Sequence, residues 1–325
     1  MIHFAIQDHG LGQNLPALVD LLSDDECSID VSFDGNDEAL NEVRQSLSGR
    51  TASLTIRRSM SVSWSSWASA QVILDSMVDA LSLPEWSYFM NLSGSCLPLL
   101  SPQDMRERLA SEACQGRIGF CTAYRLARPV CWISSQAPAA PSSHGLETVQ
   151  GRAQMLVDPS LRDLVESQTL KPPQNIGQRI GLVYTETGKN SYSVRPLSPT
   201  ELCSRVKFAA VHPIHYGRSW MILHRSIVEW LVTSSILTRV QEFLKDCFCP
   251  DEMLFPMTLF SHENPFLEAM SSDNLRYRQG GARRLDLADL PALAQAQRHL
   301  LARKVFPVDY PIAADLIRRH QLSIA

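Results

Sequence analysis

The sequence lacks the features of a membrane-inserted or secreted chain. No uncharged stretch of about 18 residues is also predominantly apolar enough to span a membrane, and the opening MIHFAIQDHG has no basic region followed by an apolar core. We therefore expect no signal peptide, no membrane span and a cytoplasmic location. Membrane association would be peripheral at most, through the C-terminal DYPIAADLIRRHQL segment, and a solvated helix accounts for that segment as well.

The eight cysteines do not form a disulfide or zinc pattern. They are scattered through apolar segments, and only Cys247 and Cys249 lie close together. No CxxC pair completes a metal set, and His212 and His215 lie in a proline-containing loop pattern. This usage is typical of buried free thiols in a reducing compartment, and we expect no structural metal.

The chain also lacks a charge excess. Its 30 basic and 34 acidic side chains give a net charge of −4, too little field to hold a nucleic-acid backbone. Only the local pairs Arg57-Arg58 and Arg283-Arg284 are candidate anion sites. With 45% hydrophobic residues, the chain fits either one elaborated α/β domain or two closely packed subdomains. The sequence does not predict an oligomeric state.

The first 130 residues alternate β-rich apolar runs with amphipathic helical stretches. Such a rhythm predicts an α/β fold with a mostly parallel sheet and crossover helices. The expected strands are IHFAIQ, CSIDVSFD, SLTIRR, YFMNLSG and RIGFCTAY; the expected helices are Leu15–Leu22, Asp37–Leu47, Trp67–Leu83 and Pro102–Ala110.

Ligands of such sheets bind beyond the carboxyl ends of the strands. Here these ends are residues 7–9, 34–36 and 93–95, and a nucleotide-sized ligand is the natural expectation. No GxGxxG and no GxxxxGK[ST] motif occurs, which argues against a dinucleotide or P-loop site.

Turn- and proline-rich segments interrupt the pattern at residues 134–145 and 171–173, where we expect a mobile or elaborated connection. Order resumes at SWMILHRSIVEWLV (219–232), which predicts a strand that leads into a helix. A final helical segment is expected over Leu290–Arg303. In between, CPDEMLF (249–255) predicts a helix that begins at Pro250, with Asp251 and Glu252 in its first turn.

Several short blocks occur in the order and spacing of one enzyme family. They are the Trp64–Trp67 segment with the helix after it, EWSYFMNLSGSCLPLLSPQDM (85–105), YGRSWMILHR (216–225), CPDEMLF, NLRY (274–277) and ARKVF (302–306). Together they resemble the core-2/I-branching β-1,6-N-acetylglucosaminyltransferase family, which includes the peptide O-xylosyltransferases. The resemblance covers most of the chain and is thin between about residues 130 and 210.

The resemblance implies a GT-A-like fold and an inverting, metal-independent glycosyltransferase. The donor would be a UDP-sugar, with N-acetylglucosamine or xylose as the sugar, and the acceptor a hydroxyl group of a glycan. Residues 1–130 would form a Rossmann-like nucleotide-sugar half, and residues 131–325 the acceptor-binding and catalytic half. No cofactor is implied, and the spacing of Asp30, Asp34 and Asp37 does not give the metal-binding Asp-x-Asp motif. Without a membrane anchor, a bacterial enzyme that builds a surface or secreted glycan is the expected member.

Chemistry and resemblance together suggest the main site residues. A UDP leaving group without a metal ion requires fixed cations. By their positions in NLRY and ARKVF, Arg276 and Lys304 resemble the diphosphate clamp of the family, with Arg303 as the alternative and solvated surface charges as the competing interpretation. Glu252 occupies the position of the catalytic base, for which burial would raise its pKa. Asp251 needs no role beyond stabilising the helix terminus.

The remaining site residues follow from the resemblance. Asp34 and Trp64 resemble nucleoside contacts, although Trp64 and Trp67 could instead belong to the core. Ser93, Gly94 and Ser95 would allow close backbone approach to the donor, and Tyr216 and Trp220, which flank an expected Gly-x-Ser-Trp turn, would form an acceptor platform. Cys96 departs from the family, whose members often carry an acidic residue there.

Two other classes of protein fit part of this pattern. A glycoside hydrolase would use paired carboxylates but has no need of a diphosphate clamp. A non-catalytic nucleotide-sugar or glycan-binding protein on the same scaffold would keep the fold and lose the base.

Overall fold

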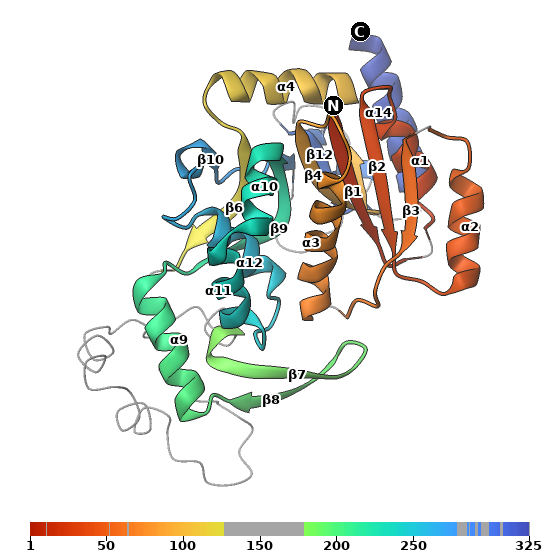
Figure 1. Ribbon diagram of the computed structural model, residues 1–325. Helices are drawn as coiled ribbons and strands as arrows, with labels where there is room; N and C mark the ends of the chain where they lie inside the picture. The colour runs from red at the N-terminus through yellow and green to blue at the C-terminus, as the bar shows by residue number, and fades with distance from the viewer. Residues whose placement is uncertain are drawn as a thin grey trace.

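The computed structural model describes the chain except residues 11, 52, 64, 127–178, 278–284, 286, 290–291, 294–298, 306–307 and 325, and the side chains of 320–324. A seven-stranded sheet, in the order β10-β6-β9-β4-β1-β2-β3, forms the centre of the molecule (Figure 1). Its strands are β1 (Ile2–Asp8), β2 (Cys27–Phe33), β3 (Leu54–Arg58), β4 (Tyr88–Ser93), β6 (Gly119–Arg125), β9 (His215–His224) and β10 (Met270–Ser271).

The sheet is mostly parallel. Strands β1 to β4 run parallel to one another, and β10 runs parallel to β6. Strand β9 is antiparallel to both of its neighbours, β4 and β6. The predicted α/β fold with a mostly parallel, Rossmann-like sheet is therefore confirmed.

Helices cover both faces of the sheet, as alternation along β1 requires. Ala5 faces a core shared with α3 (Trp67–Leu81) and with α9 (Pro199–Val211), α10 (Arg225–Thr233), α11 (Ser235–Leu244) and α12 (Asp251–Leu259). Phe4 and Ile6 face the other core, shared with α1 (Leu15–Leu22), α2 (Asp37–Leu47), α4 (Pro102–Cys114) and α14 (Tyr310–Ile324). None of the helices, as far as they are described, is long and apolar enough to span a bilayer.

Two smaller sheets and two 3-10 turns complete the described chain. A three-stranded sheet joins β5 (Cys96–Pro98), β12 (Leu301–Arg303) and β11 (Arg276–Tyr277), and β7 (Leu182–Gly188) with β8 (Ser191–Pro196) forms a hairpin. The turns are η1 (Leu267–Ala269) and η2 (Leu287–Asp289). The helix expected over Leu290–Arg303 is wrong at its end, because residues 301–303 pair with both β5 and β11. The expected 130/131 boundary and the connections at 134–145 and 171–173 lie outside the described residues.

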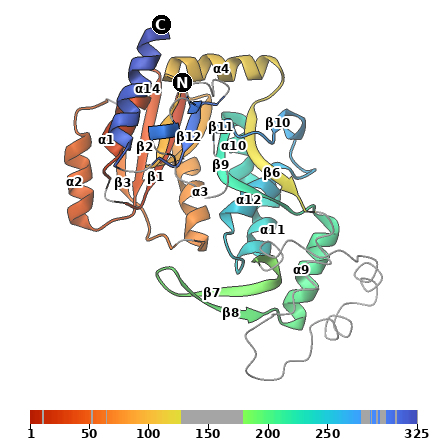
Figure 2. The same cartoon turned by 180° about the vertical axis from the view of Figure 1, so that it is seen from behind.

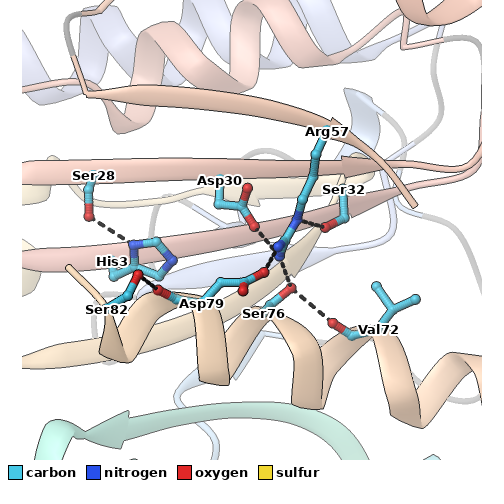
Figure 3. A network of polar contacts seen from close by, with 9 residues as sticks. All are labelled: His3, Ser28, Asp30, Ser32, Arg57, Val72, Ser76, Asp79 and Ser82. Carbon is cyan, nitrogen blue, oxygen red and sulfur yellow. Dashed lines mark hydrogen bonds and ion pairs between the residues drawn. The ribbon is translucent and has the colours of Figure 1, made fainter. Parts of the chain in front are cut away.

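A network of polar contacts joins β1, β2, β3 and α3 (Figure 3). Arg57 donates to Asp30 Oδ2 at 2.7 Å and to the hydroxyl groups of Ser32 and Ser76, each at 3.1 Å, and it forms an ion pair with Asp79. Because its guanidinium is already paired with two carboxylates, Arg57 is poorly suited to hold an anion. The expectation of an anion site at Arg57 is not supported.

His3 lies at the other end of this network and is buried and neutral. Its Nδ1 is 2.8 Å from Ser28 Oγ, and its ring stacks on Phe89 at 5.9 Å. Burial, with a smaller effect of the Arg57 charge, lowers the pKa of His3 from 6.5 to about 4.

We expect this histidine to make the fold acid-sensitive. In the unfolded chain His3 takes up a proton near pH 6.5, whereas in the folded protein it does so only near pH 4. The contribution of neutral His3 to the free energy of unfolding is therefore fully present above pH 6.5 and is lost as the pH falls toward 4. A pKa difference of this size corresponds to about 3 kcal/mol. Urea unfolding at pH 7 and pH 4.5 measures the loss, which should be smaller in His3→Phe. An equal loss in that variant would contradict the assignment to His3.

Candidate active site

Three strand ends meet at the carboxyl edge of the sheet, as predicted. The Asp34 amide donates to Asp8 O at 2.8 Å, and the Gly94 amide donates to Gln7 O at 3.2 Å. The segments after β1, β2 and β4 therefore form one continuous edge, on which a ligand of a parallel sheet is expected.

Asp8 explains why residue 94 is a glycine. A Cβ atom at Gly94 would collide with Asp8 Oδ1, and the carbonyl of Gly94 accepts from Asn14 Nδ2 at 3.0 Å. Burial raises the pKa of Asp8, against the opposing effects of His9 and of the Gly12 and Gly10 amides. Its Oδ2 is buried without a hydrogen-bond partner among the described residues. Gly94 thus allows the close approach of Asp8, and the approach of the donor at this position stays a prediction.

Asp34 lies on the same edge and is held from two sides. Its Oδ2 accepts from the Val62 amide at 2.9 Å and is 3.6 Å from Lys189 Nζ. Trp64, the other predicted nucleoside contact, lies outside the described residues.

A bulge in β9 lies at the centre of the candidate site. Cys121 of β6 pairs with Met221, but Ala123 pairs with Gly217, so residues 218–220 lie opposite Thr122 alone. Gly217 is required here, because a Cβ atom would collide with the Thr122 carbonyl. The turn expected at Gly-x-Ser-Trp is therefore wrong, and these residues form a bulged strand. Bulges of this kind redirect side chains and often lie beside active sites.

The side chain of Asn91 compensates for the interrupted ladder. Regular pairing of β4 with β9 ends at Met90, and Asn91 is completely buried next to it. Asn91 Nδ2 donates to Ser219 O, and its Oδ1 accepts from the Met221 amide, both at 2.7 Å. The buried polar groups of the bulge are thus satisfied, as a stable interior requires.

The first bulge residue, Arg218, reaches the predicted base. Arg218 Nη1 is 3.9 Å from Glu252 Oε1, and Arg179 Nη1 donates to Glu252 Oε2 at 2.6 Å. The Glu252 side chain is 28% exposed, so it is open to an acceptor but flanked by two cations.

The second bulge residue, Ser219, hydrogen-bonds Asp251, which also accepts from Ser69 Oγ at 3.1 Å. Burial raises the pKa of Asp251, and the charge of Glu252 raises it further. The sequence predicted burial of Glu252, but its side chain is 28% exposed, and the first turn of α12 directs Asp251 instead toward Ser69 of α3 and Ser219 of β9. Asp251 links these elements, a larger role than the helix-terminus carboxylate predicted from the sequence.

The third bulge residue, Trp220, stacks with the predicted clamp. The guanidinium carbons of Arg303 and Arg276 lie 3.6 and 5.6 Å from its ring centroid. The aromatic ring thus contacts two cations, and its role in an acceptor platform stays a prediction. Tyr216, the other predicted platform residue, lies 5.5 Å from Tyr124, whose side chain is exposed.

Arg276 is buried, so the surface-charge interpretation is wrong for this residue. It is 8% exposed, and its Nη2 donates to Asn91 O at 2.6 Å. Burial lowers the pKa of Arg276 to about 10, which leaves the guanidinium charged at neutral pH. Its Nε is buried without a partner in the described part of the chain. A buried cation with an unused donor is suited to an anionic ligand.

Cys96 lies between the two arginines. Arg276 Nη1 is 3.8 Å from its Sγ. Burial raises the pKa of this thiol, but the charges of Arg303 and Arg276 and the hydrogen bonds from Ser93 together bring it below the usual range.

Lys304 lies next to the predicted donor loop. The amide of the following residue, Val305, donates to Ser95 O at 3.1 Å, and the Lys304 carbonyl accepts from Leu285 at 2.6 Å. Ser93 Oγ and Ser95 Oγ are 3.0 Å apart. Lys304 is exposed, so the structure brings it to the edge without burying it.

The sequence analysis did not single out four residues of this edge, namely Arg179, Arg218, Lys189 and Asp8. Of these, Asp8 was included only in the strand end at residues 7–9. Arg218 lies inside the YGRSW block and could have been found there. Arg179 and Lys189 lie where the resemblance is thin, and only the fold brings them to the edge.

Solved structures show only distant similarity. Mouse xyloside xylosyltransferase 1 aligns over 93% of this chain and 97% of its own, with 10% identity and a TM-score of 0.38. The bifunctional glycosyltransferase WbbM aligns over 99% and 52%, with 9% identity and a TM-score of 0.41. S. aureus TarS, in complex with UDP-GlcNAc, aligns over 38% and 34%, with 8% identity and a TM-score of 0.28. This chain thus spans about a third of the TarS chain and about half of WbbM.

A search of curated protein sequences gave no match. A comparison with protein families gave a match. Residues 27–119, which contain β2 to β4 and the predicted donor loop, match the model of the Core-2/I-Branching enzyme family.

Proposed function

We propose that this protein is an inverting, metal-independent glycosyltransferase of the Core-2/I-branching family. It would transfer a sugar, N-acetylglucosamine or xylose, from UDP to a hydroxyl group of a glycan. One observation carries the proposal: the β9 bulge links the carboxylates that begin α12 to the buried Arg276 at the carboxyl edge of the sheet. The family match of residues 27–119 supports it independently.

On the donor side, the leaving UDP develops negative charge on its β-phosphate. Arg276 offers a buried guanidinium, held by Asn91 O and by the Trp220 ring, with its Nε unused among the described contacts. Lys304 would add a second cation from the exposed side. Preorganised charges of this kind stabilise a leaving group without solvent reorganisation, as a metal ion would otherwise do.

On the acceptor side, a single displacement needs a base on the face opposite the leaving group. Glu252 is partly exposed, hydrogen-bonded to Arg179, and fixed at the first turn of α12. Arg179 holds Oε2, so the more weakly contacted Oε1 would accept the proton of the acceptor hydroxyl.

A UDP-release assay tests the proposal, with UDP-N-acetylglucosamine, UDP-xylose and other UDP-sugars against a small library of glycan acceptors. We expect acceptor-dependent UDP release for one of the donors. Absence of UDP binding by calorimetry would contradict the whole proposal.

We expect UDP binding and turnover to persist in excess EDTA. The reason is that Arg276 and Lys304 replace the metal ion at the diphosphate. Calorimetry and initial rates with and without EDTA measure this, with a manganese-dependent transferase as the control for chelation. Loss of binding in EDTA that manganese restores would contradict metal independence.

A non-catalytic nucleotide-sugar-binding protein is the second candidate, and the pairing of Arg179 with Glu252 favours it. Arg179 already occupies Oε2 of this carboxylate and Arg218 lies 3.9 Å from Oε1, so a site of this kind can bind a donor without transfer. UDP-sugar binding without turnover of any donor and acceptor pair would support this candidate.

A further inference from the structure

The β7–β8 hairpin connects the two ends of the candidate site. Its base lies near α9 and α11, and its turn extends toward α3 and the loop after β3 (Figure 2). At the base, the Tyr184 amide donates to Asp246 O at 3.0 Å, and the Tyr184 ring packs on Phe248 at 5.0 Å. Nearer the turn, Tyr192 packs on the same Phe248 ring at 5.7 Å. Phe248 lies four residues before Glu252.

The turn of the hairpin lies on the nucleotide edge. The Asn190 amide donates to Ser63 Oγ at 3.2 Å, Ser63 in turn hydrogen-bonds Glu186, and Lys189 Nζ is 3.6 Å from Asp34 Oδ2. More than 120 residues of sequence separate each pair. Most residues of both strands are exposed, so the contacts at the two ends hold the hairpin in place.

The charges at the turn suggest what Lys189 does there. The Asp34 carboxylate faces an edge that, on the proposed function, receives a diphosphate, and like charges there weaken binding. Lys189 neutralises this carboxylate from the Oδ2 side, which also accepts from Val62. Asp34 Oδ1 has no partner among the described residues and stays available to a nucleoside.

We propose that the turn of the β7–β8 hairpin is part of the donor site, and that Lys189 is a positioning residue that neutralises Asp34 so that this edge accepts the charged part of UDP. The inference rests on the proposed function. It adds a residue of the C-terminal half to the nucleotide end of the site, and it predicts that the effect of Lys189 requires the phosphates.

The test compares UDP with uridine in matched variants, by calorimetry at low salt, where screening is weak. We expect Lys189→Gln to weaken UDP binding by about three- to tenfold and uridine binding by less than about twofold, and Lys189→Arg to restore it. Arg195→Gln is the matched control: it removes the same charge from the same hairpin, about 14 Å farther along β8. It should change UDP affinity by less than about twofold.

A double-mutant cycle isolates the coupling. In the Asp34→Asn background no carboxylate remains to be neutralised, so Lys189→Gln should have no further effect on UDP affinity. Wild-type affinity for UDP in Lys189→Gln, or an equal loss for uridine, would overturn the inference and leave the proposed function intact. Failure of the wild-type protein to bind UDP would overturn both.

Discussion

Glu252→Gln is expected to lower sugar transfer by roughly 10²–10⁴-fold and to leave UDP binding nearly unchanged. The amide oxygen of glutamine still accepts from Arg179, so the packing at the first turn of α12 is kept. The substitution removes the capacity to take up the acceptor proton, together with the negative charge between Arg179 and Arg218. Single-turnover transfer and UDP calorimetry on the same preparation measure the two effects separately.

Asp251→Asn is the matched control at the neighbouring position. Asp251 bonds with Ser69 and Ser219, so its replacement should cost stability, seen as a lower Tm, and lower transfer far less than Glu252→Gln does. If Asp251→Asn abolishes transfer while Glu252→Gln retains it, Asp251 is the base. If both variants stay active, the base lies elsewhere.

Arg276→Met is expected to weaken UDP binding by about 1.5–3 kcal/mol, or roughly 10- to 150-fold. The variant removes a buried cation and its unused Nε donor while keeping most of the apolar volume against Trp220. Isothermal titration with UDP measures the loss. Lys304→Ala tests the exposed half of the clamp, where a smaller effect is expected because water screens the charge.

Arg225→Met provides the control for Arg276→Met. Arg225 also lies over a tryptophan, Trp86, at 5.0 Å, and donates to the backbone carbonyl of Leu83 at 3.0 Å, but no predicted site residue contacts it. We expect this variant to lose stability and to keep UDP affinity. Equal UDP affinity in wild type and Arg276→Met would remove Arg276 from the donor site.

Local patterns predicted the first half of the fold well. The limits of α1 and α2 match the sequence prediction, because each helix has a clear start: Pro16 in the first turn of α1 and the Asn36 cap of α2. The parallel order of β1, β2 and β4 then brings Asp34 and Gly94 to one edge, as expected. The NLRY block predicted Arg276 as a site residue, and its burial agrees with its apolar sequence neighbours Leu275 and Tyr277.

The remainder depends on contacts between distant segments, which no local pattern contains. Residues 301–303 read as the end of a helix, and only their pairing with β5 and β11 makes them a strand. The link that Asp251 makes between α12 and α3 depends on Ser69, 182 residues away. The sequence offered no reason to place Lys189 in the site, because its contact with Asp34 exists only once the β7–β8 hairpin is folded against Ser63 and Asp34.

The β9 bulge connects the carboxylate side and the cation side of the candidate site through one short stretch of backbone. Arg218 contacts the carboxylate side and Trp220 the cation side, and their Cα atoms are two peptide units apart, at most about 7 Å. On the proposed function, the spacing between proton acceptor and leaving group would therefore be set largely by the backbone of the bulge and little by side-chain flexibility. Acceptor preference would then change through the surrounding loops, while the distance across the proposed reaction centre stays constant.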